Sequence, residues 1–108
     1  MKKVVPLRIP VYLKADLVSD GKSYAGIIGN LSENGAYVEI ENVKIATPFL
    51  PRKKLELKFQ VAPQKTLNLL CEVVWLYSKR IPPHSLTNDV GLEIIDPPPK
   101  YKYFLKSL

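Results

Sequence analysis

The sequence predicts an all-β protein, and three observations support this prediction. Apolar and polar residues alternate with a period of two over several short stretches, as they do in strands with one buried face. Turn-forming residues, among them 10 prolines and 5 glycines, separate these stretches. No internal stretch shows a convincing helical period. A chain of 108 residues has room for one core, so we expect a small barrel or a sandwich, and closure into a barrel would hide the strand edges.

The first half of the chain predicts an arm followed by three strands. Residues 1–10 contain Pro6 and Pro10, which each remove a backbone donor, so we expect a flexible basic arm here. Asp20-Gly21 predicts a hairpin, because both residues readily adopt positive φ values. The stretch from Asn30 to Gly35 is polar and predicts a second strand-to-strand turn. The strands themselves are expected over residues 11–18, 23–29 and 35–40.

The second half predicts three further strands and a short helix. Residues 54–61 alternate cleanly, and the apolar stretch 66–77, which carries Trp75, predicts a strand buried on much of both faces. We expect a polar loop over residues 79–88 and a last strand over 89–95. After three consecutive prolines, apolar residues at i, i+3, i+4 and i+7 predict a short helix that contains Tyr101, Phe104, Leu105 and Leu108. The expected organisation is one domain, with an arm over 1–10, a barrel over 11–96 and a C-terminal segment over 97–108.

Residue types argue against several function classes. Cys71 is the only cysteine, so the chain can form neither an internal disulfide nor a cysteine-based zinc site, and its apolar surroundings favour a buried thiol. His84 is the only histidine and lies in a proline-containing loop. The sequence shows no nucleophile with a neighbouring base, no paired carboxylates and no metal-ligand spacing, so we expect no enzyme activity, no metal and no resident cofactor. No apolar run approaches the ~20 residues that span a bilayer, and Arg8 and Pro10 interrupt a signal-like start, so we expect a cytoplasmic protein.

The chain is basic, with a net charge of +6 from 16 Lys and Arg against 10 Asp and Glu. The basic residues gather near both ends of the chain and after Pro51. Such clusters attract anionic partners, although solvated surface lysines give the same pattern. A basic barrel that binds single-stranded nucleic acid would need aromatic side chains interleaved with these cations, and the candidates are Tyr12, Tyr24 and Tyr37.

Three separated segments, in the right order, resemble the PilZ family, whose members are bacterial receptors for cyclic di-GMP. The first is Leu7-Arg8-Ile9-Pro10-Val11, which is similar to the entry that carries the family's Arg-x-x-x-Arg. The second contains Asn30, Ser32 and Gly35 in the family's Asp/Asn-x-Ser-x-x-Gly spacing. The third pairs Glu72-Val73-Val74-Trp75 with Val90-Gly91-Leu92-Glu93-Ile94, which look like the last two barrel strands. The resemblance implies a six-stranded antiparallel β-barrel that ends in a short helix.

The resemblance also implies a ligand site. Asn30, Ser32 and Gly35 would form its rigid half on the barrel, and Arg8 would bind phosphate from the arm. A guanidinium suits this task, because it makes paired hydrogen bonds to phosphate and also stacks on a purine. Read as turn chemistry alone, the same asparagine and serine cap the turn through bonds to the backbone. Cyclic di-GMP and an unidentified protein are the expected partners.

The sequence departs from the family pattern in the arm. If Arg8 is the second arginine, the first position is Val4; if Arg8 is the first, the second position is Tyr12. Lys3 is the candidate replacement, although lysine lacks the planar fork of arginine. Two hypotheses follow. The domain is either a cyclic di-GMP receptor that signals through an ordered arm and a changed surface, for instance in motility regulation, or a protein-interaction module that has lost nucleotide binding.

Overall fold

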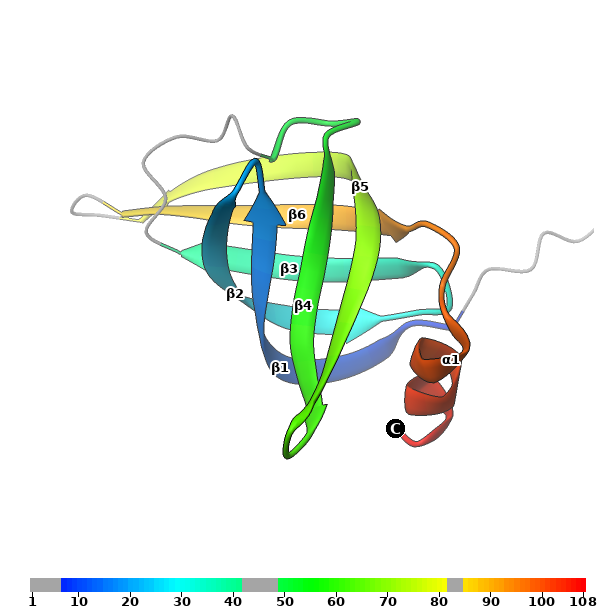
Figure 1. Ribbon diagram of the computed structural model, residues 1–108. Coiled ribbons are helices and arrows are strands. Elements are labelled where there is room, and N and C mark those ends of the chain that lie inside the picture. Colours follow the sequence, from blue (N-terminus) through cyan, green and yellow to red (C-terminus); the bar gives the residue numbers. More distant parts are fainter. Residues whose placement is uncertain (1–6, 42–48, 82–84) are drawn as a thin grey trace, which may run out of the picture.

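Six antiparallel strands close into a barrel in the order β1-β2-β3-β6-β5-β4 (Figure 1). This architecture comes from a computed structural model, which describes residues 7–41, 49–81 and 85–108. The prediction of an antiparallel β-barrel with one short C-terminal helix is confirmed. The elements are β1 (Ile9–Ser19), β2 (Lys22–Leu31), β3 (Gly35–Glu41), β4 (Lys54–Ala62), β5 (Lys65–Ile81), β6 (Ser85–Ile94) and α1 (Pro99–Lys106).

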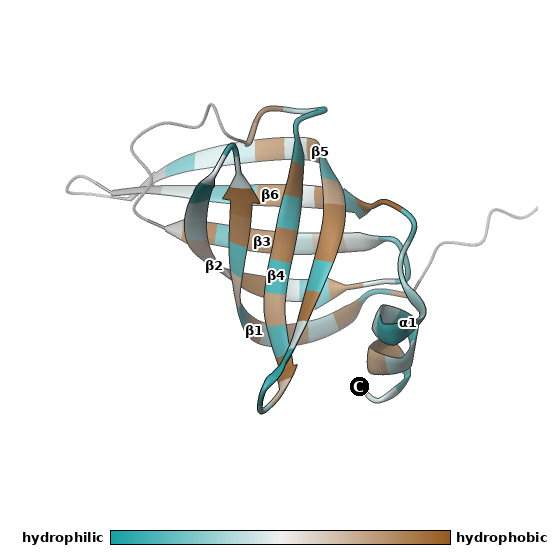
Figure 2. Ribbon diagram, viewed as in Figure 1, coloured by the Kyte–Doolittle hydropathy of each residue, from teal (hydrophilic) through white to brown (hydrophobic). Residues whose placement is uncertain are grey.

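The period-two alternation of the sequence places apolar side chains inside the barrel. In β4, Leu55, Leu57 and Phe59 are buried while the residues between them face outward. In Figure 2 the hydrophobic and hydrophilic residues alternate along the strands in the same way. Each fully buried Leu or Val side chain stabilises the fold by about 1.5 to 3 kcal/mol relative to exposure. The inward faces of all six strands therefore form one continuous core.

Two β-bulges change which side chains face outward. Between Ile28 and Asn30 the β2–β3 register shifts by one residue, so that Asn30 rather than Gly29 lies opposite Tyr37. Between Val73 and Trp75 the β5–β6 register shifts in the same way. A bulge inserts an extra residue and reverses the inside–outside phase beyond it. Trp75 therefore lies on the outer surface with 39% of its area exposed, and the expectation that its strand is buried on much of both faces is wrong.

Several strands are longer than the sequence predicts. The β5–β6 hairpin reaches Ile81 and resumes at Ser85, so most of the loop expected over residues 79–88 is strand. Strand β2 continues to Leu31, which reduces the expected six-residue turn to Ser32–Asn34. Strand β1 begins at Ile9, two residues earlier than expected. The division of the chain into arm, barrel and C-terminal segment stays a prediction.

Helix α1 lies at the end of the barrel where the β2–β3 turn is found (Figure 1). Pro99 occupies its first turn, where the missing N–H is not needed. Tyr101 and Leu105 are buried, and the ring of Phe104 lies 5.7 Å from that of Phe59, so the side of the helix that carries these three residues packs against the barrel. Leu108 is half exposed and does not join this face. In the described ranges no helix has the length and apolarity to cross a bilayer.

Candidate functional site

The turn between β2 and β3 is held by hydrogen bonds of its own backbone and of its neighbours. The Ser32 N–H donates to the Gly35 carbonyl at 2.9 Å, and the Ile94 N–H donates to the Asn34 carbonyl at 2.8 Å. The Ser32 hydroxyl lies 3.5 Å from the same Gly35 carbonyl. A Cβ at Gly35 would come within 3.2 Å of that hydroxyl, so glycine gives the turn its close packing. The structure thus places Ser32, which is 5% exposed, inside a rigid turn.

Asn30 and Arg8 meet beside this turn. Asn30 lies near the end of β2, and its Oδ1 accepts a hydrogen bond of 3.3 Å from Nη1 of Arg8. Arg8 is exposed and directly precedes β1, whose residue Pro10 lies opposite Asn30. The contact uses one of the five donors of the guanidinium. The structure therefore brings Arg8, Asn30, Ser32 and Gly35 to one end of the barrel, whereas Lys3 lies outside the described residues.

Two aromatic side chains extend this region across the outer face of the barrel. The rings of Tyr37 and Trp75 are 5.9 Å apart at 44°. Each ring covers a glycine on a neighbouring strand: a Cβ at Gly91 would lie 2.1 Å from Nε1 of Trp75, and a Cβ at Gly29 would lie 2.9 Å from the Tyr37 ring. We call Tyr37 and Trp75 the aromatic platform.

The strand register connects this aromatic platform to the turn. Asn30 lies opposite Tyr37, Tyr37 opposite Gly91, and Gly91 opposite Trp75. Directly opposed residues of antiparallel strands have their side chains on the same face. Asn30 and the aromatic platform therefore form one outward row across β2, β3, β6 and β5, about 14 Å long at the usual strand spacing. Sequence reasoning missed this row, although glycines within strands were a signal for close cross-strand contact.

Carboxylates line one side of the aromatic platform. Asp89 and Glu39 are paired across β6 and β3 in the next outward row. Burial, followed by the hydrogen bond and charge of Asp89 and by the charge of Glu39, raises the pKa of Tyr37 to about 12. The phenol therefore stays protonated and neutral at physiological pH. The row thus offers π-faces flanked by hydrogen-bond acceptors on one side and, at its β2 end, by the Arg8 cation.

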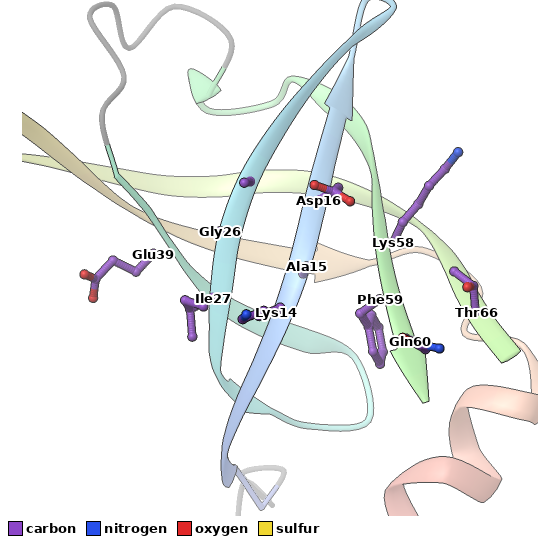
Figure 3. Close-up of a pocket in the computed structure, with 11 residues that line it drawn as sticks. Lys14, Ala15, Asp16, Gly26, Ile27, Glu39, Lys58, Phe59, Gln60 and Thr66 are labelled. Carbon is purple, nitrogen blue, oxygen red and sulfur yellow. The ribbon is translucent and has the colours of Figure 1, made fainter. Parts of the chain in front are cut away.

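A hollow of about 700 Å³ lies beside this row on the barrel (Figure 3). It is lined mainly by residues of β1, β2 and β4, shares Glu39 of β3 with the edge of the aromatic platform, and contains none of the predicted site residues. Lys14 and Lys58 contribute two positive charges to its lining, and Asp16 and Glu39 contribute two negative charges. These charges offset one another, and Gly26, Ala15 and Ala25 add no functional group. The hollow is therefore a poor receptor for an anion.

The three tyrosines proposed for nucleic-acid stacking do not share a face. Tyr24 lies opposite the buried Leu17 and packs edge-on against Phe49 at 5.1 Å, which places it on the inner side of the barrel. Tyr12 is exposed on β1, while Tyr37 packs against Trp75. Stacking of successive bases requires aromatic side chains along one groove. This arrangement gives no support to the nucleic-acid alternative.

The cysteine and the candidate metal ligands form no reactive site in the part of the chain that the structure describes. Cys71 is fully buried, and desolvation raises the pKa of its thiol to about 12, so it is neither nucleophilic nor metal-binding at neutral pH. Within the described ranges no three His, Cys, Asp or Glu side chains converge as a metal site would require. His84 lies outside these ranges.

Comparison with known protein families identifies the family of this chain. The family model described as PilZ domain matches residues 6–106, nearly the whole chain. The chain is a PilZ domain. The resemblance to this family seen in the sequence is confirmed, while the site roles of Arg8 and of the Asn30–Gly35 segment stay predictions. A comparison with curated proteins finds no significant match.

Solved structures share this fold at low sequence identity. The PilZ domain of YcgR from Escherichia coli, determined with c-di-GMP, superposes with a TM-score of 0.74 at 10% identity, covering 97% of this chain and 87% of that one. MrkH from K. pneumonia, in its apo state, gives 0.72 at 10% identity over 95% of this chain. The Bacillus subtilis inhibitor of motility, MotI or DgrA, gives 0.64 at 10% identity over 99%. This PilZ domain spans about half of the last two chains, 47% and 51% of their lengths.

Proposed function

We propose that this PilZ domain is a receptor for cyclic di-GMP, which binds on the outer face of β2, β3, β6 and β5. The observation that carries the proposal is the contact between Arg8 and Asn30 beside the turn. It places a guanidinium at the family's asparagine with donors left for a phosphate. The YcgR domain, determined with c-di-GMP, has the same fold, which supports the ligand class.

The aromatic platform supplies the part of the site that a purine requires. A guanine base presents two π-faces, and stacking of a base on an aromatic side chain is worth about 1 to 3 kcal/mol. Trp75 is exposed at one end of the row, and the other end is Asn30. Asp89 and Glu39 can accept hydrogen bonds from the N–H groups of guanine, which adenine does not present in the same pattern. The row therefore favours a nucleotide whose base is guanine over one whose base is adenine.

The arm completes the site in this account. Arg8 contacts phosphate, and Lys3, helped by Lys2, replaces the arginine that the family pattern places at Val4. Binding orders residues 1–8 over the ligand, so the signal is a disorder-to-order change that presents a new surface to a protein partner. The domain binds and signals; it performs no catalysis. A titration that leaves the amide signals of residues 2–8 unmoved would contradict the role of the arm.

Calorimetric titration with cyclic di-GMP tests the proposal. The wild-type domain is expected to bind with micromolar or tighter affinity. Because a hydrogen bond to a charged group is worth about 1.5 to 3 kcal/mol, Arg8→Ala should weaken binding roughly ten- to a hundredfold. Lys58→Ala, which removes the same charge on β4, is the matched control and should change the affinity less than twofold. If Arg8→Ala and Lys58→Ala weakened binding equally, Arg8 would contribute only its positive charge, and the proposed phosphate contact would be wrong.

A second function is favoured by one specific observation, the absence of a second arginine at Val4 or Tyr12. Under this alternative the domain binds a protein partner without any nucleotide. The double variant Arg8→Ala, Asn30→Ala distinguishes the two functions. Retained partner binding in nucleotide-free conditions supports the interaction module, and loss of nucleotide-dependent partner binding supports the receptor.

A further inference from the structure

A single buried hydroxyl connects helix α1 to the candidate binding turn. The Tyr101 side chain is fully buried, and its hydroxyl donates a hydrogen bond to the backbone carbonyl of Ser32. The two residues are 69 positions apart in the sequence. Burial raises the pKa of the Tyr101 phenol, so the group remains a proton donor throughout the physiological range. Nothing in the receptor chemistry described above requires this contact.

The turn is held from two directions, and the two are not equivalent. The Asn34 carbonyl accepts from the Ile94 N–H, which belongs to β6 and therefore to the closed barrel. The Ser32 carbonyl accepts from Tyr101, which belongs to a two-turn helix outside the barrel. Opening the first contact disrupts a strand, whereas opening the second requires α1 to move and exposes the buried Tyr101 and Leu105. The helix is the support that can move without breaking the closed barrel.

We infer that Tyr101 is a positioning residue that couples the docking of α1 to the geometry of the nucleotide-binding turn. The inference rests on the proposed receptor function. With α1 docked, the Ser32 carbonyl is satisfied, and Ser32, Gly35 and the adjacent Asn30 keep the arrangement described above. With α1 displaced, a buried carbonyl loses its donor, and the turn relaxes to recover one from water.

The coupling gives the ligand a route to a second surface. Because linkage is reciprocal, a nucleotide that binds the ordered turn more tightly must also stabilise the docked helix by the same factor. The outward face of α1 carries Lys102, Tyr103 and Lys106, all exposed. Nucleotide binding at the row would therefore hold the basic, aromatic face of α1 in one position at the end of the barrel.

Tyr101→Phe is the direct test, since it removes the hydroxyl and keeps the buried ring. Tyr103→Phe is the matched control: it removes an exposed hydroxyl from the same helix and leaves the packing of α1 on the barrel in place. Two readouts are compared in both variants, the amide chemical shifts of residues 30–35 without ligand and the affinity for cyclic di-GMP. We expect Tyr101→Phe alone to shift the turn amides and to weaken binding about tenfold. In the wild type, saturating nucleotide should slow the hydrogen exchange of the α1 amides by a similar factor, about tenfold.

The outcomes separate this inference from the receptor proposal. If the wild-type domain shows no nucleotide binding, the receptor proposal fails, and the turn amides of Tyr101→Phe still decide the positioning role. Unchanged turn shifts in Tyr101→Phe would overturn the inference, as would equal turn shifts and equal affinity losses in the two variants. Faster exchange of the α1 amides in the presence of nucleotide would overturn the predicted sign of the coupling.

Discussion

Replacement of Gly91 by alanine should displace the only tryptophan of the chain. A Cβ at this position would lie 2.1 Å from Nε1 and 2.2 Å from Cε2 of Trp75, well inside any real contact, so the indole must move. The ring is 39% exposed, so somewhat more than half of its surface is covered and becomes available for re-exposure. Because Trp75 also packs against Tyr37, its displacement breaks up the aromatic platform itself.

The expected loss of stability follows from the covered area. A fully buried large aromatic side chain covers about 250 Å², so Trp75 covers roughly 150 Å². If half of this is re-exposed, about 75 Å² at ~25 cal/mol per Å² gives about 2 kcal/mol, and loss of the Tyr37 contact adds about 0.5 to 1 kcal/mol. For a domain of this size that corresponds to a fall in Tm of about 10 °C.

Urea denaturation followed by Trp75 fluorescence measures the loss and reports the position of the ring. The control is Gly91→Ala in a Trp75→Ala background, where no ring opposes the new methyl group; circular dichroism follows its denaturation, because this background has no tryptophan. There the substitution should be neutral or stabilise by up to about 1 kcal/mol, because alanine restricts the unfolded chain more than glycine does. An unchanged emission spectrum and midpoint in the single variant would refute the packing described for Gly91.

Three further predictions concern stability. Leu57→Ala, in the centre of the core, should lower the free energy of unfolding by about 2 to 5 kcal/mol in urea denaturation, and a loss below 1 kcal/mol would contradict its complete burial. Lys53→Ala should change it by less than about 0.5 kcal/mol, because the 2.6 Å ion pair with Asp20 is exposed; a larger loss would show that the pair is more than a surface contact. Burial raises the pKa of Cys71 from 9.0 to about 12 and raises that of Tyr101, so their contribution is present below pH 9 and is lost as pH rises toward 12. Tm should therefore fall above pH 9, and less steeply in Cys71→Ala; identical slopes would exclude the thiol.

The barrel could be predicted because its strands obey a local rule. The alternation in Lys54–Ala62 reports burial directly, since each side chain faces inward or outward by its position alone. The same rule failed where a bulge interrupts it. The extra residues at Gly29 and Val74 reverse the phase. A glycine within a strand is a signal for a bulge at position 29, whereas no local signal marks Val74. For this reason the sequence did not predict that Trp75 faces outward.

The candidate site was predictable in part. The spacing of Asn30, Ser32 and Gly35 identified the turn, and the structure brings Arg8 to it. The aromatic platform was missed because Tyr37 and Trp75 come from β3 and β5, which only the barrel topology places on either side of β6. The Tyr101–Ser32 contact was missed for a similar reason. Helical periodicity placed Tyr101 on the apolar side of the helix, but periodicity cannot name the partner of its hydroxyl across 69 residues.

The most direct test of the account is the location of nucleotide binding on the barrel. An amide and indole NMR titration with cyclic di-GMP measures it. We predict shifts at Arg8, Asn30, Gly35 and Tyr37 and at the indole N–H of Trp75, with the β1 and β4 strands around Lys58 unmoved. Shifts confined to the hollow on β1, β2 and β4, or no shifts at millimolar nucleotide, would contradict the central claim that the row from Asn30 to Trp75 is the binding site.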